Sequence, residues 1–556
     1  MLKKIGLAAS LLGGVSLAAH AQDRAALLAQ HSGGTLKLSA TAAGGSIDPQ
    51  INYTNQYWPI LWNTNDGLVA YKKTSGPASN ELTPDLAEAI PKPQDGGTTY
   101  VFKLREGVKF STGKEVTTDD VVASFQRIFK VSSPTAGTFF NVIVGADKCL
   151  ADGGGAGCTL DGGVIGDAKA RTITFHLTHP DSEFLLKLGV PHAYVLPADS
   201  PAKDVGTVPL PATGPYMVAS YNPDSMLKLV RNPMFKEWSV EAQPAGFPDA
   251  IEYSFGMEPE AQVTAVERNQ VDWLFDPPPI DRLAELGTTY AKRLKIEQLQ
   301  AMYFLPMNVN LPPFDNIKAR QAVNYAINRR SAVNLFGGPN LAAPSCQILP
   351  PGLPGHADYC PYTANPGATW TAPDMAKAKQ LVKESGTAGQ KVTLVVADGA
   401  VPKALGTYVQ SVLHELGYEA SVQSLSENTH FTYIQNTNNK VQISLTEWYP
   451  DYPAASDFLN VLFSCGSFHP GTDSSVNISG WCDKPVNAEM EQALATAVTD
   501  PAAANTMWAK IDREVTDAAV VAVLFTPKHL DLLSERVGNF TFSKQYNWVY
   551  SQSWVR

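Results

Sequence analysis

The chain carries little positive charge, and after its first residues it has no long hydrophobic run. Its formal net charge of −10 argues against nucleic acid or an anionic membrane surface as a partner. After residue 21 no segment approaches the roughly 18 continuous apolar residues that a membrane-spanning helix needs. The sequence also lacks a GxSxG nucleophile elbow, a P-loop and an HExxH zinc motif. The sequence therefore lacks the catalytic motifs of the common hydrolase classes.

The first 21 residues have the pattern of a secretory signal peptide. Lys3 and Lys4 precede an apolar run over residues 5–19, and a small-x-small cleavage site ends at Ala21. We expect cleavage before Gln22 and export to the periplasm. A lipid anchor is not expected, because no cysteine follows the apolar run. The alternative is an uncleaved N-terminal anchor.

Cysteine is rare, with six in 556 residues. In an exported chain these should be paired, and fifteen connectivities are possible. Neither a CxxC pair nor a Cys/His cluster is present, so disulfides are favoured and we expect no metal or other cofactor. The spacing favours three local loops: Cys149 with Cys158, Cys346 with Cys360, and Cys465 with Cys482.

The length and the hydrophobic pattern predict several packed units. At 556 residues the chain is too long for one core, so two or three lobes are expected. A first strand is predicted over residues 33–38, and the segment 98–110 predicts a half-buried strand followed by a turn at Gly107. The segment 115–129 predicts a helix in which Thr117 and Asp120 form a capping box.

The second half of the chain alternates helices and strands. A helical stretch is predicted over residues 314–336, beginning at Asp315. Further along, strands over residues 391–396 and 418–423 flank a helix over residues 402–417. This is a βαβ unit, so we expect a parallel sheet covered by helices and an α/β fold class.

One acidic side chain, Asp451, stands in a stiff aromatic segment, SLTEWYPDYPAASDFLN (residues 444–460). Aromatic rings give a large contact area, and prolines fix the backbone that aims them. A predicted strand over residues 440–445 places Asp451 just past its carboxyl end, where open α/β sheets bind ligands. A carboxylate there can receive a cation. The alternative is a surface turn whose rings pack on the body of the protein.

Several longer segments of the chain, taken in order, resemble those of one protein family. They include TPDLAEAIPKPQDGGTTYVFKLREGVKFSTGKEVTTDDVVASFQRI (residues 83–128) and ATGPYMVASYNPDSMLKLVRNPMFKEW (residues 212–238). The series continues in residues 304–334, in EWYPDYPAASDFLN (residues 447–460) and in VVAVLFTPKHLDLLSERVGNF (residues 520–540). Together they resemble the family 5 solute-binding proteins of ABC importers, the dipeptide, oligopeptide and nickel type. The likeness covers nearly the whole mature chain in order, and it is more specific for the fold than for the ligand.

The resemblance implies an α/β, two-lobed periplasmic-binding-protein fold with an extra subdomain on the first lobe. Two hinge crossings would fall near residues 303–310 and 520–533. Lobe I would comprise residues 22–60, 190–303 and 534–556, the extra subdomain residues 61–189, and lobe II residues 304–533 with the hinge strands.

The resemblance also implies a ligand site. In peptide-binding members of the family, an Asp in a Trp-x-x-Asp motif on the second lobe pairs with the peptide's α-ammonium. Here that motif reads Trp448-Tyr449-Pro450-Asp451, so the role falls on Asp451, with Trp448 and Tyr449 as walls of the cleft. The remaining candidate ligand-binding residues are Tyr452 and, from the first lobe, Tyr53, Asn55, Gln56 and Tyr57.

The implied function is capture without catalysis. We expect an exported monomer that binds a peptide and delivers it to the membrane subunits of an ABC importer. The alternatives are the same fold binding a sugar, an opine-like compound or chelated nickel, a secreted hydrolase, and a sensor coupled to a chemoreceptor. The sequence leaves open the length and side-chain preference of the ligand and the identity of the permease.

Overall fold

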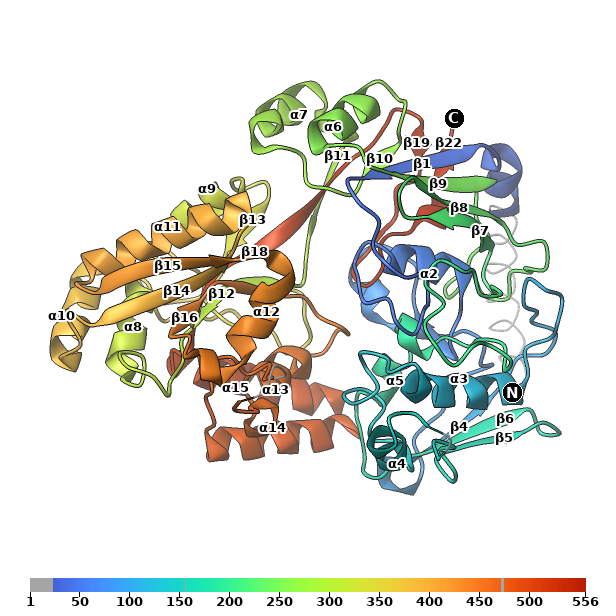
Figure 1. Ribbon diagram of the computed structural model, residues 1–556, viewed down its shortest axis with the longest axis horizontal. Helices are drawn as coiled ribbons and strands as arrows, with labels where there is room; N and C mark the ends of the chain where they lie inside the picture. The colour runs from blue at the N-terminus through green and yellow to red at the C-terminus, as the bar shows by residue number, and fades with distance from the viewer. Residues whose placement is uncertain (1–23, 156, 472–474) are drawn as a thin grey trace, which may run out of the picture.

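The computed structural model describes residues 24–155, 157–471 and 475–556 and arranges them in two lobes (Figure 1). The predicted signal peptide, residues 1–21, lies outside the described residues. Within the described part of the chain, no helix combines the length and the apolar character needed to cross a membrane. The predicted two-lobed α/β fold is confirmed.

The first lobe is built on a five-stranded sheet. Its strands are β1 (Thr35–Ala40), β7 (Tyr216–Asn222), β8 (Met226–Arg231), β9 (Ala250–Phe255) and β10 (Trp273–Leu274), in the order β10-β1-β9-β8-β7. β1 runs parallel to β9 and β10, whereas β8 pairs antiparallel with β7 and β9. Leu36 and Leu38 of β1 are fully buried, which agrees with the strand predicted there.

A smaller unit on the first lobe combines an antiparallel sheet with a helix. Its strands, β4 (Thr99–Lys103), β5 (Val164–Asp167) and β6 (Thr172–His176), lie in the order β4-β6-β5 beside α3 (Thr118–Lys130). The predicted capping box of α3 is confirmed, since the side chains of Thr117 and Asp120 each accept the other residue's backbone N–H. The apolar face of α3 packs on the sheet, where the Phe125 ring meets the Phe175 ring edge-on at 4.8 Å between centroids.

The second lobe contains the predicted βαβ unit. β14 (Lys391–Ala397) and β15 (Glu419–Leu425) pair in parallel, and α11 (Ala400–Glu415) connects them. A third strand, β16 (Ile443–Ser444), also runs parallel to β14. Leu405 of α11 is fully buried and belongs to the same hydrophobic cluster as the sheet residues, so the helix covers the sheet as expected.

Two strands connect the lobes. β11 (Leu294–Gln298) pairs antiparallel with β18 (Val521–Leu532), and the two run side by side between the halves of the molecule in Figure 1. β18 continues into the second lobe and pairs with β12 (Met302–Pro306), which also pairs with β17 (Thr446–Trp448). This places β17, and the Asp451 segment that follows it, close to the junction of the lobes.

The predicted domain boundaries remain a proposal. The distribution of the hydrophobic clusters along the chain supports these boundaries. One cluster takes nearly all its residues from the range 61–195, and another combines residues of the ranges 36–60, 216–273 and 533–550. Two further clusters lie within residues 302–525. Tyr452 from the second lobe packs in the first of these clusters, so the extra unit and the second lobe are in contact.

The remaining helices are mostly short. They are α2 (Trp58–Thr64), α4 (Ala146–Ala151), α5 (Phe184–Lys187), α6 (Pro259–Glu267), α7 (Leu283–Thr289), α10 (Met375–Ser385), α12 (Glu427–Gln435), α13 (Ser456–Phe463), α14 (Lys484–Ala497) and α15 (Pro501–Asp517). Of these, α2, α12, α13 and α14 contribute residues to the cavity described below. The remaining strands are β2 (Val69–Tyr71), β3 (Leu82–Pro84), β13 (Ala342–Pro344), β19 (Val537–Gly538), β20 (Phe542–Ser543), β21 (Asn547–Trp548) and β22 (Trp554–Val555).

The single helical stretch predicted to begin at Asp315 is two helices, α8 (Ile317–Ala326) and α9 (Arg329–Phe336). The N-cap of α8 is Asn316, whose side chain accepts a backbone N–H of the first turn. Asn328 does the same for α9. An asparagine cap satisfies free N–H groups at the start of a helix. Asn328 therefore starts a new helix, α9, in the middle of the predicted helical stretch.

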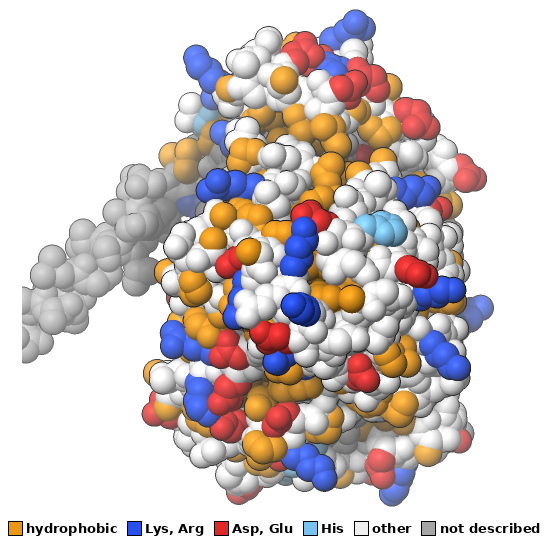
Figure 2. Space-filling model, turned by 90° about the vertical axis from the view of Figure 1, so that its left-hand side faces the viewer, with side chains coloured by type: hydrophobic (Ala, Val, Ile, Leu, Met, Phe, Trp, Pro, Cys, Tyr) orange, Lys and Arg blue, Asp and Glu red, His pale blue; other side chains and the backbone are white. Residues whose placement is uncertain are grey.

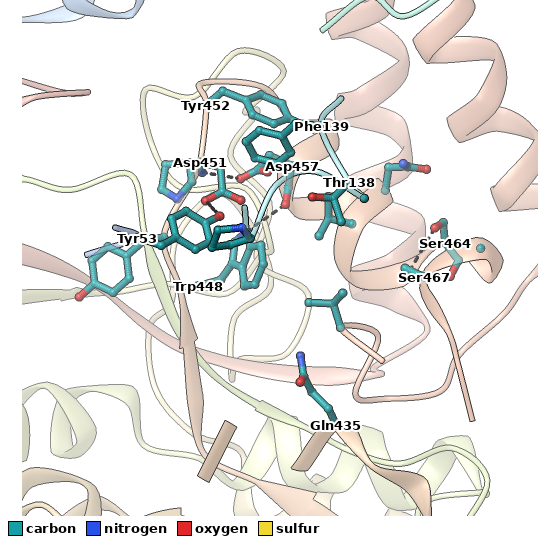
Figure 3. A pocket seen from close by; sticks show the side chains of 18 of the residues that line it. Tyr53, Thr138, Phe139, Gln435, Trp448, Asp451, Tyr452, Asp457, Ser464 and Ser467 are labelled. Atoms are coloured by element: carbon teal, nitrogen blue, oxygen red, sulfur yellow. Dashed lines mark hydrogen bonds between the residues drawn. The ribbon is translucent and has the colours of Figure 1, made fainter. Parts of the chain in front are cut away.

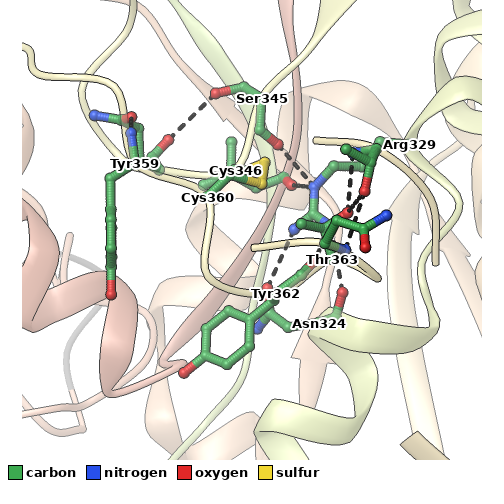
Figure 4. Close-up of a disulfide and its surroundings, with 12 residues drawn as sticks. Asn324, Arg329, Ser345, Cys346, Tyr359, Cys360, Tyr362 and Thr363 are labelled. Atoms are coloured by element: carbon green, nitrogen blue, oxygen red, sulfur yellow. Dashed lines mark hydrogen bonds between the residues drawn. A yellow bond between two sulfur atoms is a disulfide. The ribbon is translucent and has the colours of Figure 1, made fainter. Parts of the chain in front are cut away.

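The three predicted disulfides are present: Cys149–Cys158, Cys346–Cys360 and Cys465–Cys482. Figure 4 shows the second of them together with Arg329, which is fully buried. The Arg329 guanidinium donates to the carbonyl oxygen of Ser345 at 2.7 Å and to that of Tyr362 at 3.5 Å. Burial lowers the pKa of Arg329 to about 10. The disulfide and the guanidinium therefore hold the same loop from two directions.

Candidate functional site

A cavity of about 1260 Å³ lies between the lobes. Pockets for drug-sized ligands usually hold about 300 to 1,000 Å³, so this one accommodates a larger solute. Its wall combines the turn before α2 in the first lobe, the loop after α3 in the extra unit, and segments of the second lobe from α12 to α14. The site therefore depends on residues that are far apart in the sequence.

The turn that carries Asp451 is fixed by Asp457, which lies in the first turn of α13. The N–H of Asp451 donates to the Asp457 carboxylate at 3.0 Å, and the Trp448 indole N–H donates to the Asp457 carbonyl oxygen at 3.0 Å. Pro450 and Pro453 restrict the backbone between these two contacts. Asp451 is thereby held at the wall of the cavity, three residues beyond β17.

Tyr53 approaches Asp451 from the other lobe. Its hydroxyl donates a hydrogen bond to the Asp451 carboxylate, and Figure 3 shows the two side chains pointing toward one another. Removal from water raises the pKa of Asp451 to about 6, although the bond from Tyr53 opposes this shift. Removal from water and the charge of Asp451 raise the pKa of Tyr53 well above its ordinary value. The phenol therefore stays protonated and acts as the donor.

Asp457 is a second carboxylate in the wall and is only 1% exposed. Its Oδ2 accepts the Asp451 N–H, whereas its Oδ1 has no hydrogen-bond partner among the described residues. Burial, followed by the nearby charge of Asp451, raises the pKa of Asp457 well above its ordinary value. Leaving a buried acceptor unpartnered costs about 1 to 3 kcal/mol, so Asp457 Oδ1 is an energetically costly atom in the wall.

Tyr452 reaches the cavity but is 3% exposed and mainly joins the two lobes. Its hydroxyl donates to Glu183 of the extra unit at 2.6 Å, and its ring contacts Phe139 at 5.6 Å between centroids. Glu183 also accepts a hydrogen bond from Ser456 and lies 3.6 Å from the Lys187 ammonium. These contacts fix one end of the cavity.

The structure brings six of the eight predicted ligand-binding residues to the cavity wall: Tyr53, Asn55, Trp448, Tyr449, Asp451 and Tyr452. It does not bring Gln56 and Tyr57 there. Gln56 is 8% exposed, and its amide donates to the carbonyl oxygen of Ala42. Tyr57 is fully buried, and its hydroxyl donates to Tyr221. Because the chain turns between residues 54 and 58, these neighbours point into the core instead.

Sequence reasoning missed wall residues of several other segments, among them α13 and the loop that follows it. Thr138 and Phe139 follow α3, Gln435 ends α12, and Asn487 and Glu491 lie one turn apart on α14. These segments look like ordinary loops and half-exposed helices, and no local motif marks them. The four-residue spacing on α14 is the one pattern that predicts a shared polar face.

No group of three or more His, Cys, Asp or Glu side chains within residues 24–155, 157–471 and 475–556 is arranged to hold a metal ion. The wall instead offers carboxylates, amides and aromatic rings. Such a lining suits an organic solute with hydrogen-bond donors and a positive charge.

Comparison with known proteins shows the family. A family model described as bacterial extracellular solute-binding proteins, family 5 Middle, matches residues 81–470. The chain is 25% identical to the dipeptide-binding protein of Escherichia coli (strain K12) over 442 residues, covering 75% of this chain and 76% of that protein. It is 25% identical to di/tripeptide-binding protein 2 of Pseudomonas aeruginosa (strain UCBPP-PA14) over 488 residues, covering 83% and 84%.

The fold agrees with this match. The solved structure of clavulanic acid biosynthesis oligopeptide binding protein 2 superposes with a TM-score of 0.84 at 25% identity, covering 94% of this chain and 96% of that one. The chain therefore belongs to the bacterial extracellular solute-binding proteins, family 5.

Proposed function

We propose that this protein captures peptides in the cavity between its lobes and delivers them to the membrane subunits of an ABC importer. It acts in the periplasm as a monomer, after removal of residues 1–21, and performs no catalysis. The three similar proteins named above support this proposal, because all are peptide-binding proteins by name and match most of the chain.

The observation that carries the proposal is the position of Asp451. Its carboxylate lies at the wall of the cavity, on a turn held by Asp457, and it already accepts a hydrogen bond from Tyr53 across the cavity. A peptide α-ammonium is a charged donor of the kind that a pre-positioned carboxylate binds strongly. Pre-positioning matters, because it lowers the free-energy cost of ordering both charges when the lobes enclose the peptide.

Ligand-dependent stability tests the proposal. A solute that binds only the folded protein stabilises it by about 2.7 kcal/mol at one hundred times its dissociation constant. A thermal-shift screen should therefore show higher melting temperatures with pools of di-, tri- and oligopeptides, and unchanged ones with free sugars. Shifts with sugars, opine-like compounds or chelated nickel, together with none from peptides, would overturn the peptide assignment. Cleavage of the added peptides, followed by mass spectrometry, would show a hydrolase instead.

A further inference from the structure

The cavity wall has an unusual balance of charge for this protein. Four of its described residues are carboxylic acids, Glu447, Asp451, Asp457 and Glu491, and none of the described wall residues is a lysine or an arginine. His469 is the remaining wall residue whose side chain can carry a positive charge. Elsewhere the charges are mixed: Figure 2 shows basic and acidic side chains interspersed over the face that the second lobe presents.

Two of these carboxylates lie beside one another and have acceptor capacity to spare. Asp451 Oδ1 accepts from the neutral phenol of Tyr53, and Asp457 Oδ2 accepts from a backbone amide. Asp457 Oδ1, in a side chain that is 1% exposed, has no partner in the described part of the chain. None of these donors is charged. A single α-ammonium at Asp451 therefore leaves Asp457 Oδ1 without a hydrogen-bond donor.

The wall also provides a second place for a cation. Glu491 lies on α14, where its Oε1 accepts from the Asn487 amide at 2.7 Å, and it is exposed to solvent. Aromatic rings line the cavity as well, including those of Trp448 and Phe431. A ring face attracts an ammonium or guanidinium group, and this attraction adds to that of the carboxylates.

We propose that the cavity selects peptides that carry a lysine or arginine side chain in addition to the α-ammonium. This inference rests on the peptide function proposed above and names its substrate class. We also infer that no basic side chain of the wall binds the peptide's C-terminal carboxylate. A peptide with an acidic side chain places a further negative charge among the wall carboxylates, so it binds weakly.

Calorimetry with matched tripeptides tests the selectivity. We expect Ala-Lys-Ala to bind at least about tenfold more tightly than Ala-Ala-Ala, and Ala-Glu-Ala at least about tenfold more weakly, which corresponds to about 1.4 kcal/mol each way. Amidation of the C-terminus of Ala-Lys-Ala should not weaken its binding. Equal affinities for the three peptides would overturn the charge preference and leave the peptide function standing. Failure of all peptides to bind, with another solute bound instead, would overturn both.

Substitutions in the wall locate the preference. At least one of Asp457→Asn and Glu491→Gln should lower the ratio of the Ala-Lys-Ala affinity to the Ala-Ala-Ala affinity by about fivefold or more. Glu489→Gln is the matched control, because Glu489 lies on the same helix outside the cavity wall, where it pairs with Lys510. It should leave the ratio unchanged. A ratio that stays at its wild-type value in both wall variants, with melting temperatures showing both folded, would contradict the proposal.

Discussion

At the scale of single residues, the contact between Tyr53 and Asp451 leaves acceptor positions on the carboxylate for the proposed ligand ammonium. The Tyr53 hydroxyl occupies one acceptor position of the carboxylate. A carboxylate has two oxygens and about four acceptor positions, so an ammonium and a phenol can share it. Asp451 thus contributes charge, while Tyr53 contributes a contact from the opposite lobe.

The raised pKa of Asp451 predicts a pH dependence of peptide binding. Its pKa is raised to about 6 because the carboxyl group is removed from water. A raised pKa means that the group becomes protonated as the pH falls through about 6, and the neutral acid no longer attracts an ammonium. The affinity for free-amine peptides should therefore fall between about pH 7 and pH 5, approaching tenfold per pH unit at the acidic end. Calorimetry across this range measures the fall.

An N-acetylated peptide of the same sequence is the control for this pH series. It lacks the ammonium, so its weak affinity should change little over the same range. Parallel pH profiles for the two peptides would assign the pH dependence to another group and remove the support for Asp451 as the ammonium partner.

At the scale of elements, the capping box of α3 is a local feature that the sequence predicts fully. Thr117→Ala removes a side chain that accepts the Asp120 N–H. The loss of such a cap should lower the free energy of unfolding by about 1 kcal/mol. Thr112→Ala, at an exposed position shortly before the helix, is the matched control and should have a much smaller effect. Urea denaturation followed by circular dichroism compares the two; equal losses would show that the cap does not stabilise the helix.

The disulfide Cys346–Cys360 closes a loop of 14 residues, which Arg329 also holds through Ser345 and Tyr362. Removing a cross-link of this size raises the entropy of the unfolded chain and should lower the free energy of unfolding by about 3 kcal/mol. The variant with alanine at both positions tests this in urea, beside the wild type with and without reductant. An unchanged denaturation midpoint would mean that the Arg329 hydrogen bonds alone suffice to hold the loop.

Elements with strong local signals were predictable, and elements that depend on competing caps were not. The βαβ unit around α11 follows from its apolar periodicity, and the strand of Leu36 and Leu38 follows from alternation. The break between α8 and α9 escaped prediction, because Asn328 is compatible with a helix interior and its role as a cap depends on the local backbone. Gln56 and Tyr57 were placed in the site because a sequence cannot show which way a tight turn directs each side chain.

At the scale of the whole molecule, the resemblance to a family predicted more than local pattern did. It identified the two lobes and the position of Asp451, since both follow from segments that occur in order along the chain. It did not identify Thr138 on the extra unit or Glu491 on α14, which reach the cavity only through tertiary packing. The charge balance of the wall could therefore be recognised only in three dimensions.

The proposed pairing of Asp451 with the α-ammonium of a captured peptide can be measured in a double-mutant cycle. The measurement is calorimetry of wild type and Asp451→Asn, each with a free-amine peptide and with its N-acetylated form. Removing one partner of an enclosed charge pair costs about 2 to 5 kcal/mol, or about thirtyfold to several thousandfold in affinity. We expect Asp451→Asn to lose this much for the free-amine peptide and little for the acetylated one. Equal binding of the free-amine peptide by wild type and Asp451→Asn would show that Asp451 does not bind the ammonium and is a turn residue only.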